Sequence, residues 1–279
     1  MEFVKMHGCG NDFIIIDSFK DTPPADLGAF AKHICNRHFG LGADGVLVVL
    51  PSDFTDVRMV IINSDGSEAQ MCGNGIRCFA SYVYEQGIVK KTAMTVETAA
   101  GIIKPQLIFA EDGKLQKVCV DMGIPRIRPW EIPVELEGEQ VVGVPMDIDG
   151  YHFELTCVSM GNPHAVSFWR DLTKAPVLTL GPVLECHPLF PQKTNVEFVE
   201  IVDTDEIRMR VFERGVGETL ACGTGAAASV VAAILNGYTD RQVKVHVLGG
   251  TLEYDWRADG HLMMTGPVVK VAAGVIDWE

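Results

Sequence analysis

The chain has 279 residues, of which 47% are hydrophobic, so it is long enough to bury one or two cores. Its 23 basic and 37 acidic residues give a formal net charge of −14, and no basic cluster stands out. This balance excludes nucleic acids and acidic membrane surfaces as expected partners. The sequence has no apolar run of about 18 residues and no signal-peptide core, so we expect a cytoplasmic protein without a transmembrane helix.

The first half of the sequence predicts a sheet with two helices. Helices are expected over Ala25–Arg37, after a pair of prolines, and over Ile76–Gln86, where Gly87 can supply a left-handed cap. Runs of β-branched and apolar residues predict the strands Phe3–His7, Phe13–Asp17, Val46–Leu50, Val57–Asn63, Met94–Thr98, Ile102–Phe109 and Leu115–Asp121. The proline-rich segment Pro125–Pro133 is expected to be extended and to connect the two halves.

The second half repeats this order. Helices are expected over Leu178–His187 and Ala226–Leu235, and the second is apolar almost all round, which predicts that it is buried. The expected strands are His152–Ser159, Ala165–Trp169, Val196–Val202, Ile207–Glu213, Val243–Val247, Gly250–Trp256, Leu262–Gly266 and Val268–Ile276. The last of them is expected to return to the first half.

These elements predict the α+β class. We expect two pseudo-symmetric domains, each a curved mixed or antiparallel sheet wrapped around a central buried helix. The predicted domains are residues 1–122 together with 268–279, and residues 123–267.

Two matching segments, Met71–Gly75 and Ala221–Gly225, each place a cysteine before a Gly-x-Gly and a predicted helix. Cys72 and Cys222 stand 150 positions apart, and the same spacing continues on both sides without a gap. It relates Met59 to Met209, Glu68 to Glu218, Gly73 to Gly223, Gly75 to Gly225 and Gly87 to Gly237. We interpret this register as an internal duplication that leaves two equivalent cysteines.

A cysteine at the start of a helix lies beside unpaired N–H groups and a partial positive charge. This setting can lower a thiol pKa from about 8.5 toward about 3.5–7.5. The following Gly-x-Gly lets backbone N–H groups approach and hold a carboxylate. Two such helix starts would supply two bases on opposite sides of one carbon, as inversion at an α-carbon requires. Either cysteine alone would be interpreted as structural, because buried free cysteines are usually inert.

Polar residues recur near the two cysteines at similar offsets. Asn11 and Asn162 are 151 positions apart, as are Asp44 and Asn195, while Asn63 and Glu213 are 150 apart. The set expected near the thiols is Asn11, Asn63, Asn162, Asn195, Glu213 and Arg214. It suits a zwitterion, because arginine can clamp a carboxylate and glutamate can accept from an ammonium group.

Each of these residues also has a purely structural interpretation. Asparagines often only shape loops. Glu213 and Arg214 can be a solvated strand end, since surface ion pairs contribute little. His164, which follows Asn162-Pro163, can be a histidine of the core or of a rigid loop.

Cysteine usage indicates free thiols. Eight cysteines in 279 residues fall below the density of a disulfide scaffold, and no Cys-x-x-Cys occurs. Cys35-x-x-His38 lacks a matching second pair, so no metal is expected. We interpret the other cysteines as small buried hydrophobic residues, namely Cys9, Cys35, Cys78, Cys119, Cys157 and Cys186.

The chain resembles the diaminopimelate epimerase family over nearly its whole length. The resemblance is carried, in the family's order, by MHGCGNDF, RHFGLGADG, NSDGSEAQMCGNGIRC, SMGNPHAV, TNVEFV, ERGVGETLACGTGAA and LGGTLEYDW. It implies a two-base isomerase without a cofactor, PLP included, that interconverts LL-2,6-diaminoheptanedioate and its meso form. It further implies a role in lysine biosynthesis and peptidoglycan precursor supply, a small-molecule amino-acid substrate, and commonly a homodimer.

Residue by residue, the resemblance implies that Cys72 and Cys222 are the acid–base pair and that His164 and Glu213 tune them. The substrate contacts it implies are Asn11, Asn63, Gly73, Asn74, Asn162, Asn195, Glu213, Arg214, Gly223 and Thr224. The chain departs from the family at Gly45, where some members carry a glutamine, so that contact is expected to be missing or replaced.

Two other interpretations stay open at this point. The first is another isomerase of the same fold, such as a proline racemase or a phenazine-pathway isomerase. The second is a non-enzymatic module that binds small molecules and carries inert cysteines.

Overall fold

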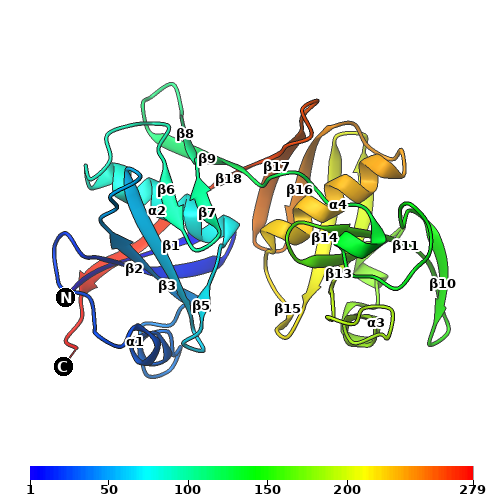
Figure 1. The fold of residues 1–279 in the computed structure, drawn as a ribbon, viewed down its shortest axis with the longest axis horizontal. Helices are drawn as coiled ribbons and strands as arrows, with labels where there is room; N and C mark the ends of the chain where they lie inside the picture. The colour runs from blue at the N-terminus through cyan, green and yellow to red at the C-terminus, as the bar shows by residue number, and fades with distance from the viewer. Residues whose placement is uncertain (279) are drawn as a thin grey trace. The chain divides into compact units, whose positions relative to one another are not determined.

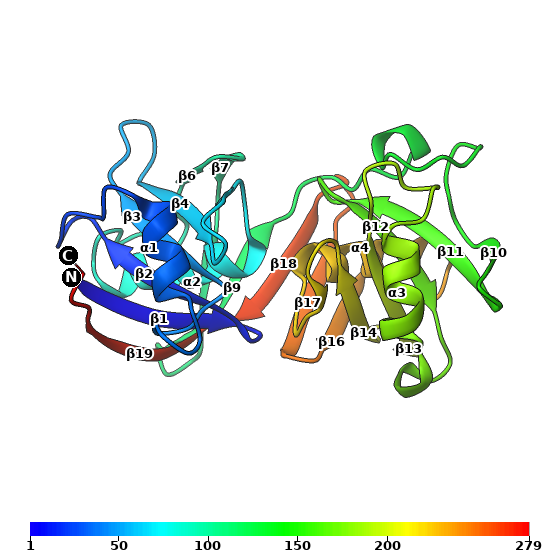
Figure 2. The ribbon, with the colours of Figure 1, turned by 90° about the horizontal axis from the view of Figure 1, so that it is seen from below.

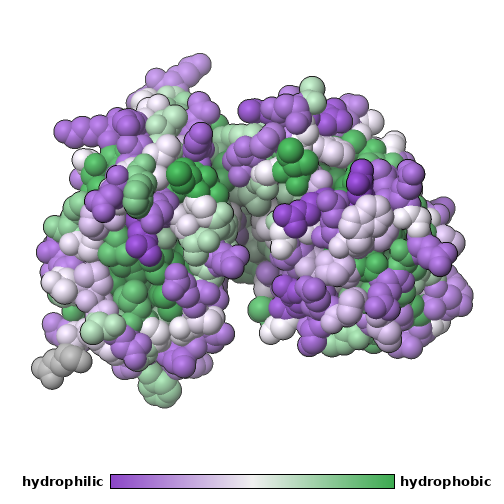
Figure 3. Space-filling view, in the orientation of Figure 1, coloured by the Kyte–Doolittle hydropathy of each residue, from purple (hydrophilic) through white to green (hydrophobic). Residues whose placement is uncertain are grey.

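The computed structural model describes residues 1–278 and divides into two compact units. Unit 1 comprises Met1–Asp121 and the described residues from Thr265 onward, and unit 2 comprises Met122–Met264. The predicted domains had boundaries of 1–122 with 268–279, and 123–267; their last residue, Glu279, lies outside the described residues. Hydrophilic side chains cover much of the visible surface of each unit, with apolar patches between them (Figure 3).

Unit 1 contains a mixed sheet with the strand order β19-β1-β2-β3-β4-β6-β7, and a short β5 beside β4 (Figure 1). The β2–β3 and β4–β6 pairs are parallel and the other pairs are antiparallel. Its elements are β1 (Glu2–Gly8), β2 (Asn11–Asp17), α1 (Leu27–Ile34), β3 (Gly45–Leu50), β4 (Val57–Asn63), β5 (Glu68–Ala69), α2 (Gly73–Glu85), β6 (Val96–Thr98), β7 (Gly101–Ile103), the hairpin β8 (Gln106–Phe109) and β9 (Leu115–Asp121), and β19 (Val269–Val275).

The two helices of unit 1 pack on opposite faces of its sheet. Helix α1 lies against the sheet (Figure 2), and its Phe30 and Ile34 join Ile14 and Ile16 of β2 in one hydrophobic cluster. The intervening residues of the strands face the other way, because successive side chains in a strand point to opposite faces. That second face packs on α2, which contacts β1–β4 and β9 and is almost entirely buried.

Unit 2 repeats this topology in the order β10-β11-β12-β13-β14-β16-β17-β18, with a short β15 beside β14. The β12–β13 and β14–β16 pairs are parallel, as are the corresponding pairs of unit 1. Its elements are η1 (Pro129–Glu131), β10 (Val144–Ile148), β11 (Tyr151–Ser159), β12 (Pro163–Phe168), η2 (Leu172–Lys174), α3 (Val177–Glu185), β13 (Asn195–Asp203), β14 (Glu206–Glu213), β15 (Gly217–Glu218), α4 (Gly223–Leu235), β16 (Gln242–Val247), β17 (Gly250–Trp256) and the first half of β18 (Leu262–Pro267), whose residues from Thr265 onward belong to unit 1.

Helix α4 is the central helix of unit 2. It contacts six strands of the sheet and its side chains from Ala226 to Ala233 are all buried (Figure 1). The predicted burial of this apolar helix and the predicted α+β class are therefore confirmed. The last predicted strand does return to the first half, because β19 pairs with β1.

Some local predictions were wrong. The strand expected over Ile102–Phe109 divides into β7 and β8, because Pro105 lacks the N–H that a continuous strand needs. The helix expected over Ala25–Arg37 is shortened to α1, and two of the cysteines interpreted as buried are not: Cys186 is exposed and Cys119 is only partly buried.

Within residues 1–278, no helix is both long and apolar enough to cross a membrane.

Candidate active site

The first half of the candidate site is built on the N-terminus of α2. Cys72 is the N-cap residue, and its sulfur accepts a hydrogen bond from the Gly75 backbone N–H at 3.3 Å. Gly73 and Asn74 form the first turn, where helical N–H groups have no acceptor within the helix. A half-buried thiol therefore lies beside the positive end of a helix dipole.

Asn11 reaches Cys72 from the tight turn between β1 and β2. Both residues of Cys9–Gly10 have left-handed φ values, 53° and 84°, as a two-residue hairpin turn requires. The Asn11 Oδ1 atom accepts from the Cys72 thiol at 3.5 Å and from Asn74 Nδ2 at 3.2 Å. Its Nδ2 atom donates to Asp44 Oδ2 at 2.7 Å, so the amide is oriented with its oxygen toward the sulfur.

A cluster of charges holds Asp44 in place. Arg37 Nη2 bonds Asp44 Oδ1 at 2.8 Å and Asp12 Oδ1 at 2.9 Å, and Lys5 Nζ lies 2.9 Å from Asp12 Oδ2. Burial acts to raise the pKa of Asp12, but the hydrogen bonds from Arg37 and Lys5 leave it lowered. These ion pairs fix the start of β2, which begins at Asn11.

A buried arginine lies just behind Cys72. Arg77 is fully buried; its Nη1 donates to the Gly73 carbonyl at 3.3 Å and its Nη2 to Asn74 Oδ1 at 2.9 Å. Gly8 provides the space, because a Cβ atom there would lie 2.8 Å from Nη2. The arginine thereby fixes the Asn74 amide that contacts Asn11.

Asn63 and Gly45 pair with each other at the ends of β4 and β3. The Asn63 Nδ2 atom donates to Ser67 Oγ at 3.0 Å. A Cβ atom at Gly45 would lie 2.7 Å from the Ile62 carbonyl oxygen, so the backbone has no room for a side chain there. The glutamine contact that the family resemblance implies at this position is therefore missing from this chain.

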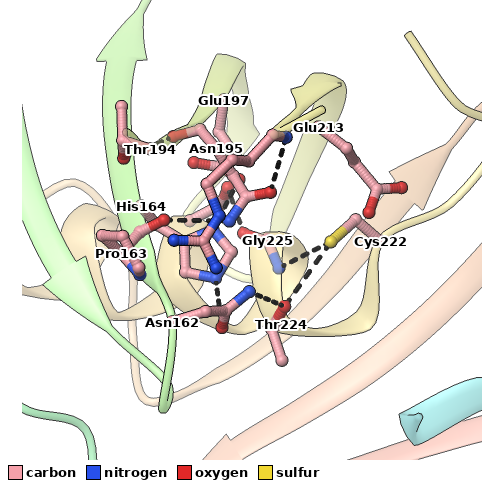
Figure 4. A network of polar contacts seen from close by, with 12 residues as sticks. Asn162, Pro163, His164, Thr194, Asn195, Glu197, Glu213, Cys222, Thr224 and Gly225 are labelled. Atoms are coloured by element: carbon pink, nitrogen blue, oxygen red, sulfur yellow. Dashed lines mark hydrogen bonds and ion pairs between the residues drawn. The ribbon is translucent and has the colours of Figure 1, made fainter. Parts of the chain in front are cut away.

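The second half of the candidate site is built on the N-terminus of α4 (Figure 4). Cys222 is the N-cap residue and accepts from the Gly225 backbone N–H at 3.4 Å. Its sulfur lies 3.5 Å from Thr224 Oγ1, and the Tyr254 hydroxyl donates to the Gly223 carbonyl at 2.8 Å. The first turn of the helix is thereby held from β17.

Asn162 connects this helix start to a buried pair. Its Nδ2 atom donates to Thr224 Oγ1 at 3.3 Å, and its Oδ1 atom lies 3.0 Å from His164 Nε2. The Nδ1 atom of His164 lies 2.7 Å from Glu197 Oε1, and both side chains are fully buried. Polar contacts therefore run without interruption from Glu197 to the sulfur of Cys222 (Figure 4).

Glu213, the last residue of β14, accepts a hydrogen bond from the Thr219 hydroxyl. Burial raises the pKa of Glu213, although hydrogen bonds with Thr219 and Cys222 oppose the shift. Burial, followed by the charges of Glu213 and Glu197, raises the pKa of the Cys222 thiol well above its usual value. The expectation that a helix start lowers the thiol pKa is therefore wrong for Cys222, because desolvation and two carboxylates outweigh the helix dipole.

Asn195 and Arg214 both make contacts within unit 2. The Asn195 Nδ2 atom donates to the Pro163 carbonyl at 2.9 Å, and its Oδ1 atom accepts from the Arg214 backbone N–H at 3.0 Å. The Arg214 Nη1 atom donates to the Gln192 carbonyl at 2.9 Å. Asn195 thus ties the start of β12 to the end of β14.

The strand register corrects one predicted equivalence. Phe13 lies beside Gly45 in the β2–β3 pair, and His164 lies beside Asn195 in the β12–β13 pair. The counterpart of Asn195 is therefore Gly45 rather than Asp44, because the spacing between the two repeats changes from 151 to 150 residues between the first and the second strand of these pairs.

Each unit gathers part of the predicted set around its own cysteine. Unit 1 places Asn11, Gly73 and Asn74 at Cys72 and Asn63 at the end of β4, while unit 2 holds Cys222, Asn162, His164, Asn195, Glu213, Arg214, Gly223 and Thr224. The roles of these residues in catalysis and substrate binding stay predictions. Among residues 1–278, no three His, Cys, Asp or Glu side chains are placed to hold a metal ion.

The sequence analysis did not identify Arg77 and Glu197, although each left a signal. Arg77 is a charged residue inside a predicted helix of mostly apolar and aromatic residues. Glu197 lies in the predicted strand Val196–Val202, two positions after Asn195, and both side chains share a face if that strand begins one residue earlier, as β13 does.

The chain matches known sequences over almost its full length. The family model described as diaminopimelate epimerase matches residues 3–127 and 156–271. The chain is 52% identical to the diaminopimelate epimerase of Moorella thermoacetica, over 275 residues that cover 98% of each sequence. It is 47% identical to the diaminopimelate epimerase of Methanococcus maripaludis, covering 99% of this chain and 100% of the relative.

Solved structures with low sequence identity share the fold. A phenazine biosynthesis protein of the PhzF family from Bacillus anthracis superposes with a TM-score of 0.71 at 17% identity, covering 99% of each chain. A probable proline racemase from Agrobacterium radiobacter K84 gives a TM-score of 0.69 at 17% identity, covering 100% of this chain and 93% of the other. At this identity the likeness concerns the fold alone.

Proposed function

Because the chain belongs to the diaminopimelate epimerase family, we propose that it interconverts LL-2,6-diaminoheptanedioate and the meso form in lysine biosynthesis, without a cofactor. The observation that carries the proposal is the repeated helix start. Cys72 and Cys222 are both N-cap residues, each followed by Gly-x-Gly, in a chain about half identical to named diaminopimelate epimerases.

The proposed reaction is a pair of proton transfers at one α-carbon. A thiolate takes the α-proton, so that the C–H bond breaks and an S–H bond forms. The second thiol gives its proton to the opposite face, so that its S–H bond breaks and a new C–H bond forms. The enzyme then holds its proton on the other sulfur, and no external oxidant or reductant is needed.

The weak acidity of an α-proton makes stabilisation of the negative charge essential. The helix-start N–H groups at Gly73, Asn74, Gly223 and Thr224 are the proposed donors to the reacting carboxylate, since preorganised donors stabilise charge that develops in the transition state. Removal of water from the closed site would strengthen these hydrogen bonds.

The remaining substrate contacts are proposed by their chemistry. Arg214 would bind a carboxylate and Glu213 an ammonium group, because their charges are complementary. The amides Asn11, Asn63, Asn162 and Asn195 would bind either group. His164 and Glu213 are the proposed tuning residues of the thiols.

Three further proposals concern the setting of the enzyme. The first is that the protein is a homodimer, and the second is that it lies in the cytoplasm. The third is that its product supplies peptidoglycan precursors as well as lysine. Size-exclusion chromatography with light scattering measures the first of these directly. A monomer at micromolar concentration would contradict it.

The decisive experiment is α-proton exchange in deuterated water. Purified protein is incubated with LL-diaminoheptanedioate without added cofactor, and deuterium incorporation and the meso product are followed together. We expect one deuterium at the inverted carbon of the product. Absence of both exchange and meso product in a folded sample would overturn the proposal.

A substrate panel separates this activity from those named for the proteins of similar fold. Proline, glutamate and lysine are offered under the same conditions. We expect turnover of diaminoheptanedioate only, because it alone of these substrates has a second ammonium and a second carboxylate group for the remaining proposed contacts to bind. Faster inversion of proline would favour a racemase instead.

A further inference from the structure

Glu197 is a fully buried carboxylate that the proposed reaction does not yet use. It lies on β13, in the face of the sheet that packs on α4, two residues after Asn195. Its Oε1 atom contacts His164 Nδ1, while its Oε2 atom has no hydrogen-bond partner among residues 1–278. A buried charge is costly without partners, so its retention at this place calls for an explanation.

The carboxylate lies directly against the first turn of α4. A Cβ atom at Gly225 would be 2.7 Å from Glu197 Oε1 and 3.3 Å from the sulfur of Cys222. Gly225 therefore permits the helix start, the thiol and the carboxylate to come together. A larger residue at this position would push them apart.

Glu197 also determines how His164 can bond. An ionised carboxylate only accepts hydrogen bonds, so the His164 Nδ1 atom donates to it at 2.7 Å. This contact fixes the ring plane and places Nε2 3.0 Å from Asn162 Oδ1, an oxygen that only accepts, so a hydrogen bond there requires a proton on Nε2 as well. The Asn162 amide then presents Nδ2 to Thr224, whose hydroxyl touches Cys222.

The titratable groups around Glu197 come from several strands. They are His164 on β12, Glu213 on β14, Cys157 on β11 and Cys222 at the start of α4, with the Tyr254 hydroxyl from β17 on the Gly223 carbonyl. After burial, the Glu197 charge is a further cause that raises the pKa values of Cys157, Glu213 and Cys222. Its effect therefore extends to two groups of the proposed site.

We propose that Glu197 is a positioning residue with two effects: it orients His164 and Asn162 behind the helix start, and its charge holds Cys222 as the proton-carrying thiol of the resting enzyme. Cys72 is then the first base; as a thiolate it no longer donates to Asn11 Oδ1, and it keeps the Gly75 N–H as a donor. This inference rests on the proposed function, because it assigns the two thiols their starting roles in that reaction.

Two substitutions separate the two effects. Glu197→Gln keeps the length of the side chain and an acceptor for His164, but removes the charge. Glu197→Asp keeps the charge but shortens the reach to His164. Glu200→Gln is the matched control on the same strand, since Glu200 bonds the Leu172 N–H and Arg208 away from the helix start.

The first readout is alkylation of Cys222 by iodoacetamide against pH, resolved by mass spectrometry of the peptides. In Glu197→Gln we expect the Cys222 rate at pH 8 to rise about tenfold, as a one-unit shift in the pKa gives. We expect wild-type rates for Cys222 in Glu197→Asp and in Glu200→Gln. An unchanged Cys222 profile in folded Glu197→Gln would overturn the electrostatic effect.

The second readout is epimerisation. We expect kcat to fall at least about tenfold in Glu197→Asp with KM little changed, because the histidine loses its support while the substrate contacts remain, and such a fall is 1.4 kcal/mol of barrier. Wild-type kcat in Glu197→Asp would overturn the positioning effect. If Glu197→Gln does not fold, the test uses Glu197→Asp alone. A reduced kcat with a wild-type rate of Cys222 alkylation then supports the proposal. Faster Cys222 alkylation in Glu197→Asp contradicts it.

The alkylation assay needs no substrate, so the two proposals fail in different ways. Wild-type protein that does not exchange the α-proton contradicts the proposed function, whatever the cysteine rates are. Wild-type protein that turns over normally, with Glu197→Gln unchanged in both readouts, contradicts only the role of Glu197.

Discussion

The two helix starts share a backbone but differ in the charge buried beneath them. Cys72 and Cys222 both cap helices of 13 residues, and both sulfurs accept from the N–H three residues later. Behind Cys72 lies the fully buried Arg77, where the second repeat has Ala227. Behind Cys222 lies Glu197 instead.

The residues that pack on the two equivalent glycines show the same divergence. A Cβ atom at Gly75 would meet Leu47 and Phe13, both apolar, at 3.4 Å. The strand register places Glu197 and His164 at the corresponding positions of unit 2. Duplication therefore preserved the geometry of the thiols, while substitution in the core gave one a buried cation and the other a buried anion. A two-base reaction begins with one thiol charged and the other carrying a proton, and the buried cation and anion favour the arrangement with the charge on Cys72.

The largest expected effect comes from removing either sulfur. Cys72→Ala and Cys222→Ala should each lower epimerisation by about 10²–10⁴ or more, the contribution of a lost acid–base group. The rate is measured as meso product formed from the LL substrate. Cys186→Ser is the control, because this cysteine is exposed and should leave turnover unchanged. Near-normal turnover in either alanine variant would refute the two-base scheme.

The next largest effect is a difference in stability between alanine substitutions at the equivalent glycines Gly225 and Gly75. Gly225→Ala places a Cβ atom 2.7 Å from Glu197 Oε1, a side chain that is fully packed, whereas the nearest atom for Gly75→Ala is Cys72 Cβ at 3.3 Å. We expect Gly225→Ala to lower the free energy of unfolding by about 1–3 kcal/mol, the usual cost of overpacking. Gly75→Ala should cost less, since its closest contacts, at 3.3–3.4 Å, need smaller shifts; the gain in helix propensity of about 1 kcal/mol applies to both variants.

Urea unfolding of the two variants measures this difference. Equal losses would mean that unit 2 relaxes around Glu197 as readily as unit 1 relaxes around Leu47. Cys222 alkylation in the same samples reports whether the helix start has moved away from the carboxylate.

The comparison also shows what sequence patterns can reveal. The duplication, the four helices and the cysteine positions follow from spacing and periodicity, because these features are local or repeat along the chain. The buried pair of His164 and Glu197 could not be found in this way, since a charged residue in a strand is usually exposed. Burial depends on α4 packing over β13, which is a tertiary property. Likewise, the raised thiol pKa of Cys222 follows first from burial and then from the charges of Glu213 and Glu197, which are brought to it by the fold.

The smallest expected effect is a change in the pH dependence of protein stability when Glu213 is substituted, compared with a substitution at the equivalent position, Asn63. The pKa of Glu213 is raised in the folded protein, chiefly by burial, so the folded state binds this proton more tightly than the unfolded state does. Its contribution to stability is therefore fully present below the unfolded pKa, near 4.3, and is lost as the pH rises through the folded value. In Glu213→Gln this loss of stability with rising pH is absent, because the glutamine amide does not titrate.

We expect the melting temperature of Glu213→Gln, relative to wild type, to rise as the pH increases above about 4, because the wild-type carboxyl ionises at a higher pH in the folded than in the unfolded protein. Asn63→Gln is the matched control, since it exchanges one neutral amide for another at the equivalent place in unit 1. Its difference from wild type should be constant with pH. A flat difference for Glu213→Gln as well would mean that Glu213 ionises as easily in the folded protein as in the unfolded chain. The electrostatic contrast between the two helix starts would then rest on Arg77 and Glu197 alone.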